Sequence, residues 1–190
     1  MIAQLAVPFR RTRERLSAFW ANRRGVAALE FAIILPGLLL IYLGGFEASK
    51  ALEASRKVES TAETVGNLVA RNRTMTSIGL QNIYDISAAI MVPFPTEGLT
   101  MIVTTVSVDA TGKGTVDWSR ANTGPALNPG DPYTVPPELV FDAATYLVVV
   151  TVSYPYNPVM DYGGFFGGTK MTKEYTFRPR ISKSIVWDNS

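Results

Sequence analysis

An uninterrupted apolar run near the N-terminus constrains this chain more than any other feature. The run covers residues 26–46 and reads VAALEFAIILPGLLLIYLGGF, with 16 apolar residues in 21 and a single charge, Glu30. As a helix it would be about 31 Å long, which matches the roughly 30 Å hydrocarbon core of a bilayer. It is longer than the apolar part of a secretory signal peptide, and no small-residue cleavage site follows it. The run therefore predicts a transmembrane helix over residues 26–46, in preference to a buried core helix.

Charge is distributed unevenly along the chain. Residues 1–25 carry six arginines and one acid, a net charge of +5, whereas the remainder carries −3. By the positive-inside rule, arginines such as Arg23 and Arg24 beside the apolar run orient the N-terminus toward the cytoplasm. Everything after about residue 47 is then exported. Because the net charge of +2 comes from this short basic segment, it predicts no nucleic-acid binding.

The chain contains no cysteine and no histidine. These absences exclude a thiol nucleophile, a Ser-His-Asp triad and an ordinary zinc site. An exported enzyme built on carboxylates stays open as an alternative, and its candidate acids are Asp109, Asp117, Asp131, Asp142 and Asp161. Most of these acids stand beside Gly or Pro, as acids in turns do. We therefore predict a protein that is not an enzyme and that needs no metal or cofactor.

Glu30 is the informative residue of the apolar run. An acid five positions into a membrane span is costly, and it is usually retained for a partner or a pathway. The setting of Glu30 is RRGVAALEF: Arg23 and Arg24, a glycine, four apolar residues, the glutamate and Phe31. This pattern resembles the class III signal of type IV pilins and pseudopilins, which a prepilin peptidase cuts after the glycine.

The resemblance implies a processing site between Gly25 and Val26, so that residues 1–25 are a basic leader peptide that is removed. Such a cut would leave a free amine on Val26 at the edge of the bilayer. The Glu30 carboxylate of a neighbouring subunit could pair with that amine and so fix the axial stagger of bundled helices. Glu30 and Phe31 are therefore candidate residues for contacts between subunits.

A longer stretch of the sequence narrows the resemblance to one family of pilin-like proteins. The sequence GVAALEFAIILPGLLLIYLGGFEASKAL, with Pro36 in mid-span, is similar to TadE-like proteins, the pseudopilins of tight-adherence (Flp-type) pilus systems. Flp-type major pilins carry Glu-Tyr where this chain has Glu30-Phe31, and they are far shorter, which favours a minor pilin or assembly factor. The resemblance implies a bacterial inner-membrane protein with a periplasmic C-terminal domain, and it allows incorporation into an extracellular pilus. Its implied partners are the membrane, a prepilin peptidase, other pilins and the assembly machinery.

An alternative from a different class stays open. The chain would then be an unprocessed, signal-anchored periplasmic binding module that is not incorporated in a filament. This alternative predicts that a bulky residue can replace Gly25 without consequence.

Residues 47–92 are expected to form an exported helical region. Good helix formers continue past the apolar run, which predicts one long helix over residues 26–70. A seam of small residues at coiled-coil spacing is expected to pack on a head, or against another pilin helix: Ala51, Ser55, Val58, Ala62, Val65 and Val69. A second helix is predicted over residues 77–91, with one face made by Ile78, Ile83, Ile86, Ile90 and Met91.

Residues 93–190 are predicted to form a β-rich head. Strands are expected over residues 99–108, 115–118 and 146–154, and residues 173–177 and 181–187 are expected to supply one or two more. A proline-rich loop is expected at 121–138. The motif GGFFGG at 163–168 is a second loop, and several tyrosines could line a groove or pack: Tyr154, Tyr156, Tyr162 and Tyr175. The expected fold is α+β and pilin-like, with a long N-terminal helix packed on an antiparallel sheet and a second short helix.

Overall fold

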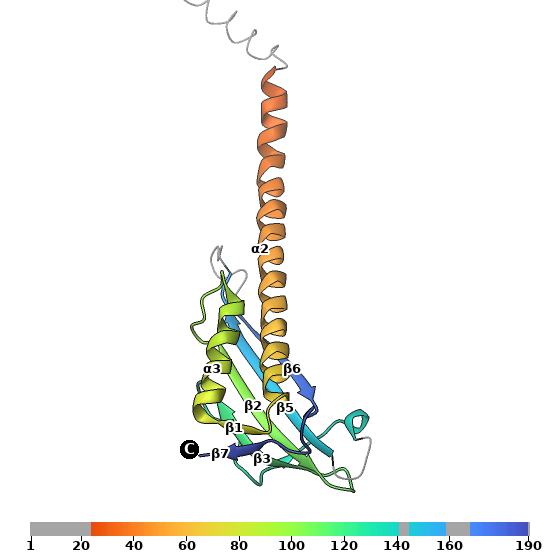
Figure 1. Ribbon diagram of the computed structural model, residues 1–190. Coiled ribbons are helices and arrows are strands. Elements are labelled where there is room, and N and C mark those ends of the chain that lie inside the picture. Colours follow the sequence, from red (N-terminus) through yellow and green to blue (C-terminus); the bar gives the residue numbers. More distant parts are fainter. Residues whose placement is uncertain (1–23, 141–144, 159–167, 190) are drawn as a thin grey trace, which may run out of the picture. The chain divides into compact units, whose positions relative to one another are not determined.

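The computed structural model describes residues 24–140, 145–158 and 168–189 (Figure 1). It divides into two compact units, Met1–Phe46 and Glu47–Ser190. Arg23 and most of the predicted leader lie outside the described residues. So do Asp142, Asp161, Tyr162 and the first five residues of the GGFFGG motif.

Helix α2, Arg24–Ala70, begins in the first unit and ends in the second. Its apolar part makes it long and apolar enough to cross a membrane, as the sequence predicts. Large apolar side chains there are exposed, for example Ile33, Leu40 and Ile41. Pro36 lies inside the helix, a position that membrane helices tolerate because neighbouring groups can satisfy the freed carbonyl.

The part of α2 in the second unit buries a stripe of small side chains. Five of them are fully buried, at intervals of three or four residues: Ala54, Val58, Ala62, Val65 and Val69. This confirms that the predicted seam packs on a head. Ser55, which the spacing placed in the seam, is only half-buried, because the adjacent Ala54 takes the inward position.

A short strand, β1 (Thr74–Thr76), leads into α3 (Ser77–Ala88) and a 3-10 turn, η1 (Ala89–Met91). The Thr76 side chain caps α3 by accepting a hydrogen bond from the Gly79 backbone N–H at 3.1 Å. The side chains that α3 buries are Leu80, Ile83, Tyr84 and Ser87. The predicted apolar face was wrong for Ile78 and Ile86, which are exposed, because the inward face follows the Leu80–Tyr84–Ser87 stripe.

The head is built on a five-stranded antiparallel sheet in the order β4-β3-β2-β5-β6. Its strands are β2 (Thr100–Val108), β3 (Gly114–Ala121), β4 (Pro132–Tyr133), β5 (Thr145–Tyr156) and β6 (Thr169–Phe177). β5 is an interior strand, as its apolar sequence predicts. The last strand, β7 (Val186–Asp188), leaves this sheet and pairs in parallel with β1. A long N-terminal helix followed by an antiparallel sheet and a short helix confirms the α+β, pilin-like fold.

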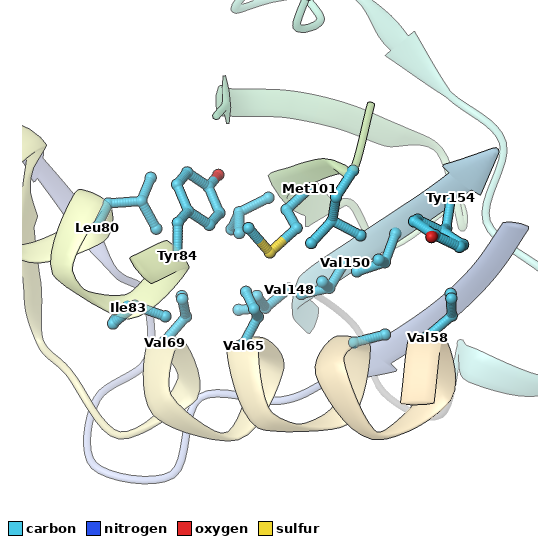
Figure 2. Close-up of a cluster of buried hydrophobic side chains, with 14 of the residues drawn as sticks. Val58, Val65, Val69, Leu80, Ile83, Tyr84, Met101, Val148, Val150 and Tyr154 are labelled. Atoms are coloured by element: carbon cyan, nitrogen blue, oxygen red, sulfur yellow. The ribbon is translucent and has the colours of Figure 1, made fainter. Parts of the chain in front are cut away.

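Side chains alternate between two cores on the two faces of the sheet. On one face, residues of α2 and α3 interdigitate with β2 and β5, including Val65, Tyr84, Met101 and Val150 (Figure 2). On the other face, Val106 and Leu147 form a smaller cluster with Val135. Val135 comes from the proline-rich loop, which therefore covers sheet in addition to connecting strands. The loop contains β4 and ends in a second 3-10 turn, η2 (Pro137–Leu139).

Candidate assembly and anchoring site

The residues of the predicted processing and assembly motif lie in the first two turns of α2. Gly25 and Val26 stand directly after its first residue, and Val26 and Glu30 are four residues apart, so they share one side of the helix. The side chains of Val26 and Phe31 are 55% and 59% exposed. The helix therefore presents all four predicted residues at one end.

Nothing described in the chain engages the motif. A Cβ atom added at Gly25 would meet nothing within 4 Å. Glu30 is exposed, and among residues 24–140, 145–158 and 168–189 no side chain pairs with its carboxylate. An acid on an apolar helix that no described residue of its chain pairs with is suited to a partner outside the chain.

A second acid, Glu47, marks the point where the apolar run ends. Its side chain is 4% exposed, and the Tyr156 hydroxyl donates a hydrogen bond of 2.5 Å to its carboxylate. Sequence reasoning missed this pair. The signal was the spacing of the seam, because Glu47 stands four residues before Ala51 and continues the buried stripe backwards. Burial, together with the Glu47 carboxylate, raises the pKa of Tyr156 above its ordinary value.

Further polar contacts hold the rest of this helical segment to the head. The Tyr175 hydroxyl donates to Glu59 at 2.5 Å, and this bond raises the pKa of Tyr175 to about 12. The Lys57 ammonium donates to the Ile90 carbonyl at 3.0 Å. Each contact joins an α2 side chain to a different part of the second unit, so the part of α2 that belongs to this unit is fixed both along its axis and in rotation.

Three of the five candidate catalytic acids lie in the described residues, and each has a local structural partner. Asp109 accepts hydrogen bonds from the backbone and side chain of Thr111, which hold its pKa below the ordinary range. Asp131 accepts from Asn128, and Asp117 accepts from the Tyr146 hydroxyl at 2.6 Å. Within the described ranges, no group of three or more His, Cys, Asp or Glu side chains is placed to hold a metal ion.

Comparison with known proteins agrees with the N-terminal motif. The family model described as TadE-like protein matches residues 25–66, which begin at the candidate processing glycine and end four residues before α2 does. The match confirms the TadE-like resemblance and relates the chain to tight-adherence pili. No curated protein and no solved structure matches the chain. The strands of the head lie outside the matched segment.

Proposed function

We propose that this chain, TadE-like over residues 25–66, is a minor pilin or pseudopilin that takes part in assembling a tight-adherence type IV pilus. The observation that carries the proposal is the state of Glu30. Its carboxylate is exposed on an apolar helix, and no described residue of its own chain pairs with it. A subunit that is completed only by its neighbours would have this property.

The proposed anchor is the apolar part of α2, with the arginine-rich N-terminus in the cytoplasm and the head in the periplasm of a bacterial inner membrane. A prepilin peptidase would cut between Gly25 and Val26, two residues into the helix. The first turn of a helix lacks some of its backbone hydrogen bonds, so this peptide bond can open without unfolding the rest. A residue without a side chain also gives an enzyme access to the backbone.

The cut would create a partner for Glu30, which pairs with no other described residue. In the intact chain the Val26 nitrogen is an amide, whereas in the processed chain it is an ammonium group. Burying an ammonium and a carboxylate together as a pair among apolar helices costs far less free energy than burying either group alone. Pairing between neighbouring subunits would also set the axial stagger of their helices. The role of this part of the protein would then be assembly, with no catalytic step.

Intact-mass measurement tests the processing step. The full chain is produced in cells with and without a prepilin peptidase, beside a Gly25→Leu variant and a matched Gly37→Leu control. Gly37 lies in the same helix and, like Gly25, has nothing within 4 Å of an added Cβ. We expect a mature N-terminus at Val26 in peptidase-positive cells for the natural chain and the control, but not for Gly25→Leu.

An intact Met1 in peptidase-positive cells would overturn the proposal. The chain would then be better described as an unprocessed, signal-anchored binding module, for which Gly25→Leu has no consequence.

A further inference from the structure

Exposed cations of the second unit gather where α2 ends. The chain after β6 runs beside the residues that follow α2, because the Arg180 backbone N–H donates to the Ala70 carbonyl at 2.9 Å and the Val186 N–H donates to the Arg73 carbonyl at 3.0 Å. From there β7 continues in parallel with β1 (Figure 1). These two segments carry the exposed cations that we call the basic end of the head: Arg71, Arg73, Arg180 and Lys183.

The basic end contains no balancing acid. Residues 64–84 and 175–187, which include both segments, hold no Asp and no Glu, and the acids that flank these ranges are Glu63, Asp85, Glu174 and Asp188. Within the described ranges, no acid forms an ion pair with any cation of the basic end. Residues 47–190 as a whole are slightly acidic, with 12 Lys and Arg against 14 Asp and Glu. The positive charge is therefore local, and it attracts an anionic partner to this surface in particular.

One cation of the basic end is held in place by a neutral group. The Arg180 guanidinium donates to the side-chain oxygen of Asn67 at 2.8 Å. This bond orients the guanidinium but leaves its charge uncompensated, and the guanidinium has further N–H donors. A planar guanidinium can form two parallel hydrogen bonds with a carboxylate. Arg180 is therefore positioned to bind a carboxylate of a partner.

Exposed aliphatic side chains stand among these cations. Ile181 follows Arg180 directly and is 53% exposed, and Val186, three residues after Lys183, is 59% exposed. Covering such side chains with other apolar surface is favourable. Arginine beside apolar side chains is typical of protein–protein interfaces. A charged polysaccharide would match the cations but would leave the aliphatic side chains uncovered.

The aromatic ring of β7 is engaged within the head. The Arg120 guanidinium lies over the Trp187 ring, 4.4 Å from its centre. The Trp187 ring also contacts Trp118, with 5.1 Å between the ring centres. Single-stranded nucleic acids bind by stacking their bases on free aromatic rings. The contacts of Trp187 therefore favour a protein partner over a nucleic acid.

We propose that the basic end docks an acidic, amphipathic segment of a partner protein. Carboxylates of that segment pair with the four cations, and its apolar side chains cover the two exposed aliphatic ones. The inference deepens the proposed assembly role, and it rests on that role for the partner being a component of the pilus system. The docking itself needs neither cleavage after Gly25 nor pairing of Glu30. Its failure and that of the proposed function are therefore distinguishable.

Fluorescence anisotropy with the full chain in a non-ionic detergent tests the proposal. The first probe is a labelled synthetic peptide that repeats Glu-Glu-Val-Ala. A second peptide of equal length repeats Glu-Glu-Ser-Ser, so that it carries the same charge without the apolar groups. A labelled polygalacturonate of equal charge is the third probe, and micelles without protein are the blank.

The test variant reverses two charges of the basic end, Arg71→Glu/Arg73→Glu. The matched control is Lys113→Glu/Lys170→Glu, which changes the net charge equally at two exposed lysines elsewhere in the second unit. Arg71→Lys/Arg73→Lys keeps the charges, and Ile181→Ser removes one apolar group. Thermal unfolding checks that each variant is folded.

We expect the natural chain, the lysine variant and the control to bind the Glu-Glu-Val-Ala peptide. The charge-reversed variant should bind it at least about tenfold more weakly, because two attractive charges become repulsive. Ile181→Ser should weaken binding of this peptide but not of the Glu-Glu-Ser-Ser peptide. The affinity should also fall as the salt concentration rises.

Three results would overturn the proposal. The first is equal binding of the Glu-Glu-Val-Ala peptide by the folded charge-reversed variant and the control. The second is binding of the Glu-Glu-Ser-Ser peptide or of polygalacturonate as tightly as the first peptide, which would make the basic end a general site for polyanions. The third is loss of peptide binding when phosphatidylglycerol is added to the micelles, which would assign the surface to an anionic lipid.

Discussion

Tyr156, at the end of β5, donates a 2.5 Å hydrogen bond to Glu47, the first residue of α2 beyond the apolar run. Both side chains are at least nine-tenths buried. The bond therefore ties the last strand residue on this side of the sheet to the point where the helix changes from apolar to polar. From Ala54 onward, the side chains that α2 buries fully are small. Few other buried groups therefore hold the helix near Glu47.

The Glu47–Tyr156 contact predicts the effect of Tyr156→Phe. The substitution removes one buried donor and leaves the ring, so we expect a loss of about 1–3 kcal/mol in the free energy of unfolding. Denaturant unfolding of the full chain in detergent, followed by near-UV circular dichroism, measures it. The matched control is Tyr133→Phe, which removes only a long 3.4 Å bond to an exposed acid. Equal stability of the two variants would show that the buried contact contributes nothing special.

Gly66 predicts an overpacking defect where α2 passes β6. A Cβ atom at this position would lie 1.9 Å from Cε2 of Phe177. Gly66→Ala gains about 1 kcal/mol of helix propensity, but overpacking costs about 1–3 kcal/mol, so we expect net destabilisation. A lower denaturation midpoint, restored when Phe177→Leu is added, is the expected observation. Gly44→Ala, where an added Cβ meets nothing within 4 Å, should cause no loss.

We expect the raised pKa values of two tyrosines in the head, Tyr133 and Tyr175, to make the protein unfold at alkaline pH. Burial and the Glu174 carboxylate raise the pKa of Tyr133, and the bond to Glu59 raises that of Tyr175, in both cases from 10.0 to about 12. Because each pKa is raised in the folded state, the stabilisation is complete below pH 10 and is lost as the pH rises toward 12. Phenolate absorbance and far-UV circular dichroism should therefore change together in this window. Titration of these tyrosines near pH 10 in a folded chain would contradict the prediction.

We expect replacement of Glu30 to reduce assembly of the protein without preventing its folding. Glu30→Leu should leave the Val26 ammonium of a neighbouring subunit without its partner, which costs about 3–5 kcal/mol in an apolar setting. We expect at least about tenfold less of this variant in sheared pilus fractions or in complexes purified with the pilus machinery. Glu63→Gln is the matched control, an exposed acid further along the same helix. Normal assembly of Glu30→Leu would remove the pairing from consideration.

Sequence predicted best where neighbouring residues alone decide the structure. Composition and length determine that residues 26–46 form an apolar helix, and the spacing of Val58, Val65 and Val69 determines which side of α2 is buried. These patterns need no knowledge of the rest of the chain. The TadE-like segment, which falls within this helix, was recognisable for the same reason.

Features that depend on distant residues were missed. Ile78 and Ile86 are as apolar as Leu80, and only the position of the sheet decides which of them faces inward. The proline-rich loop was predicted as a connection, but its packing on the outer face of the sheet depends on Val106 and Leu147. The Glu47–Tyr156 pair was hidden because its members are far apart in the sequence and each is unremarkable alone.

The parallel pairing of β1 with β7 has a consequence for the time at which the head matures. Thr74 and Met75 pair with Val186 and Trp187, so residues just after α2 are joined to the last strand of the chain. Because the chain is synthesised from its N-terminus, β1 is present long before β7. The small sheet therefore closes only after nearly the whole head has been synthesised. A chain that stops early would keep an open β1 edge, which is a template for pairing with other chains.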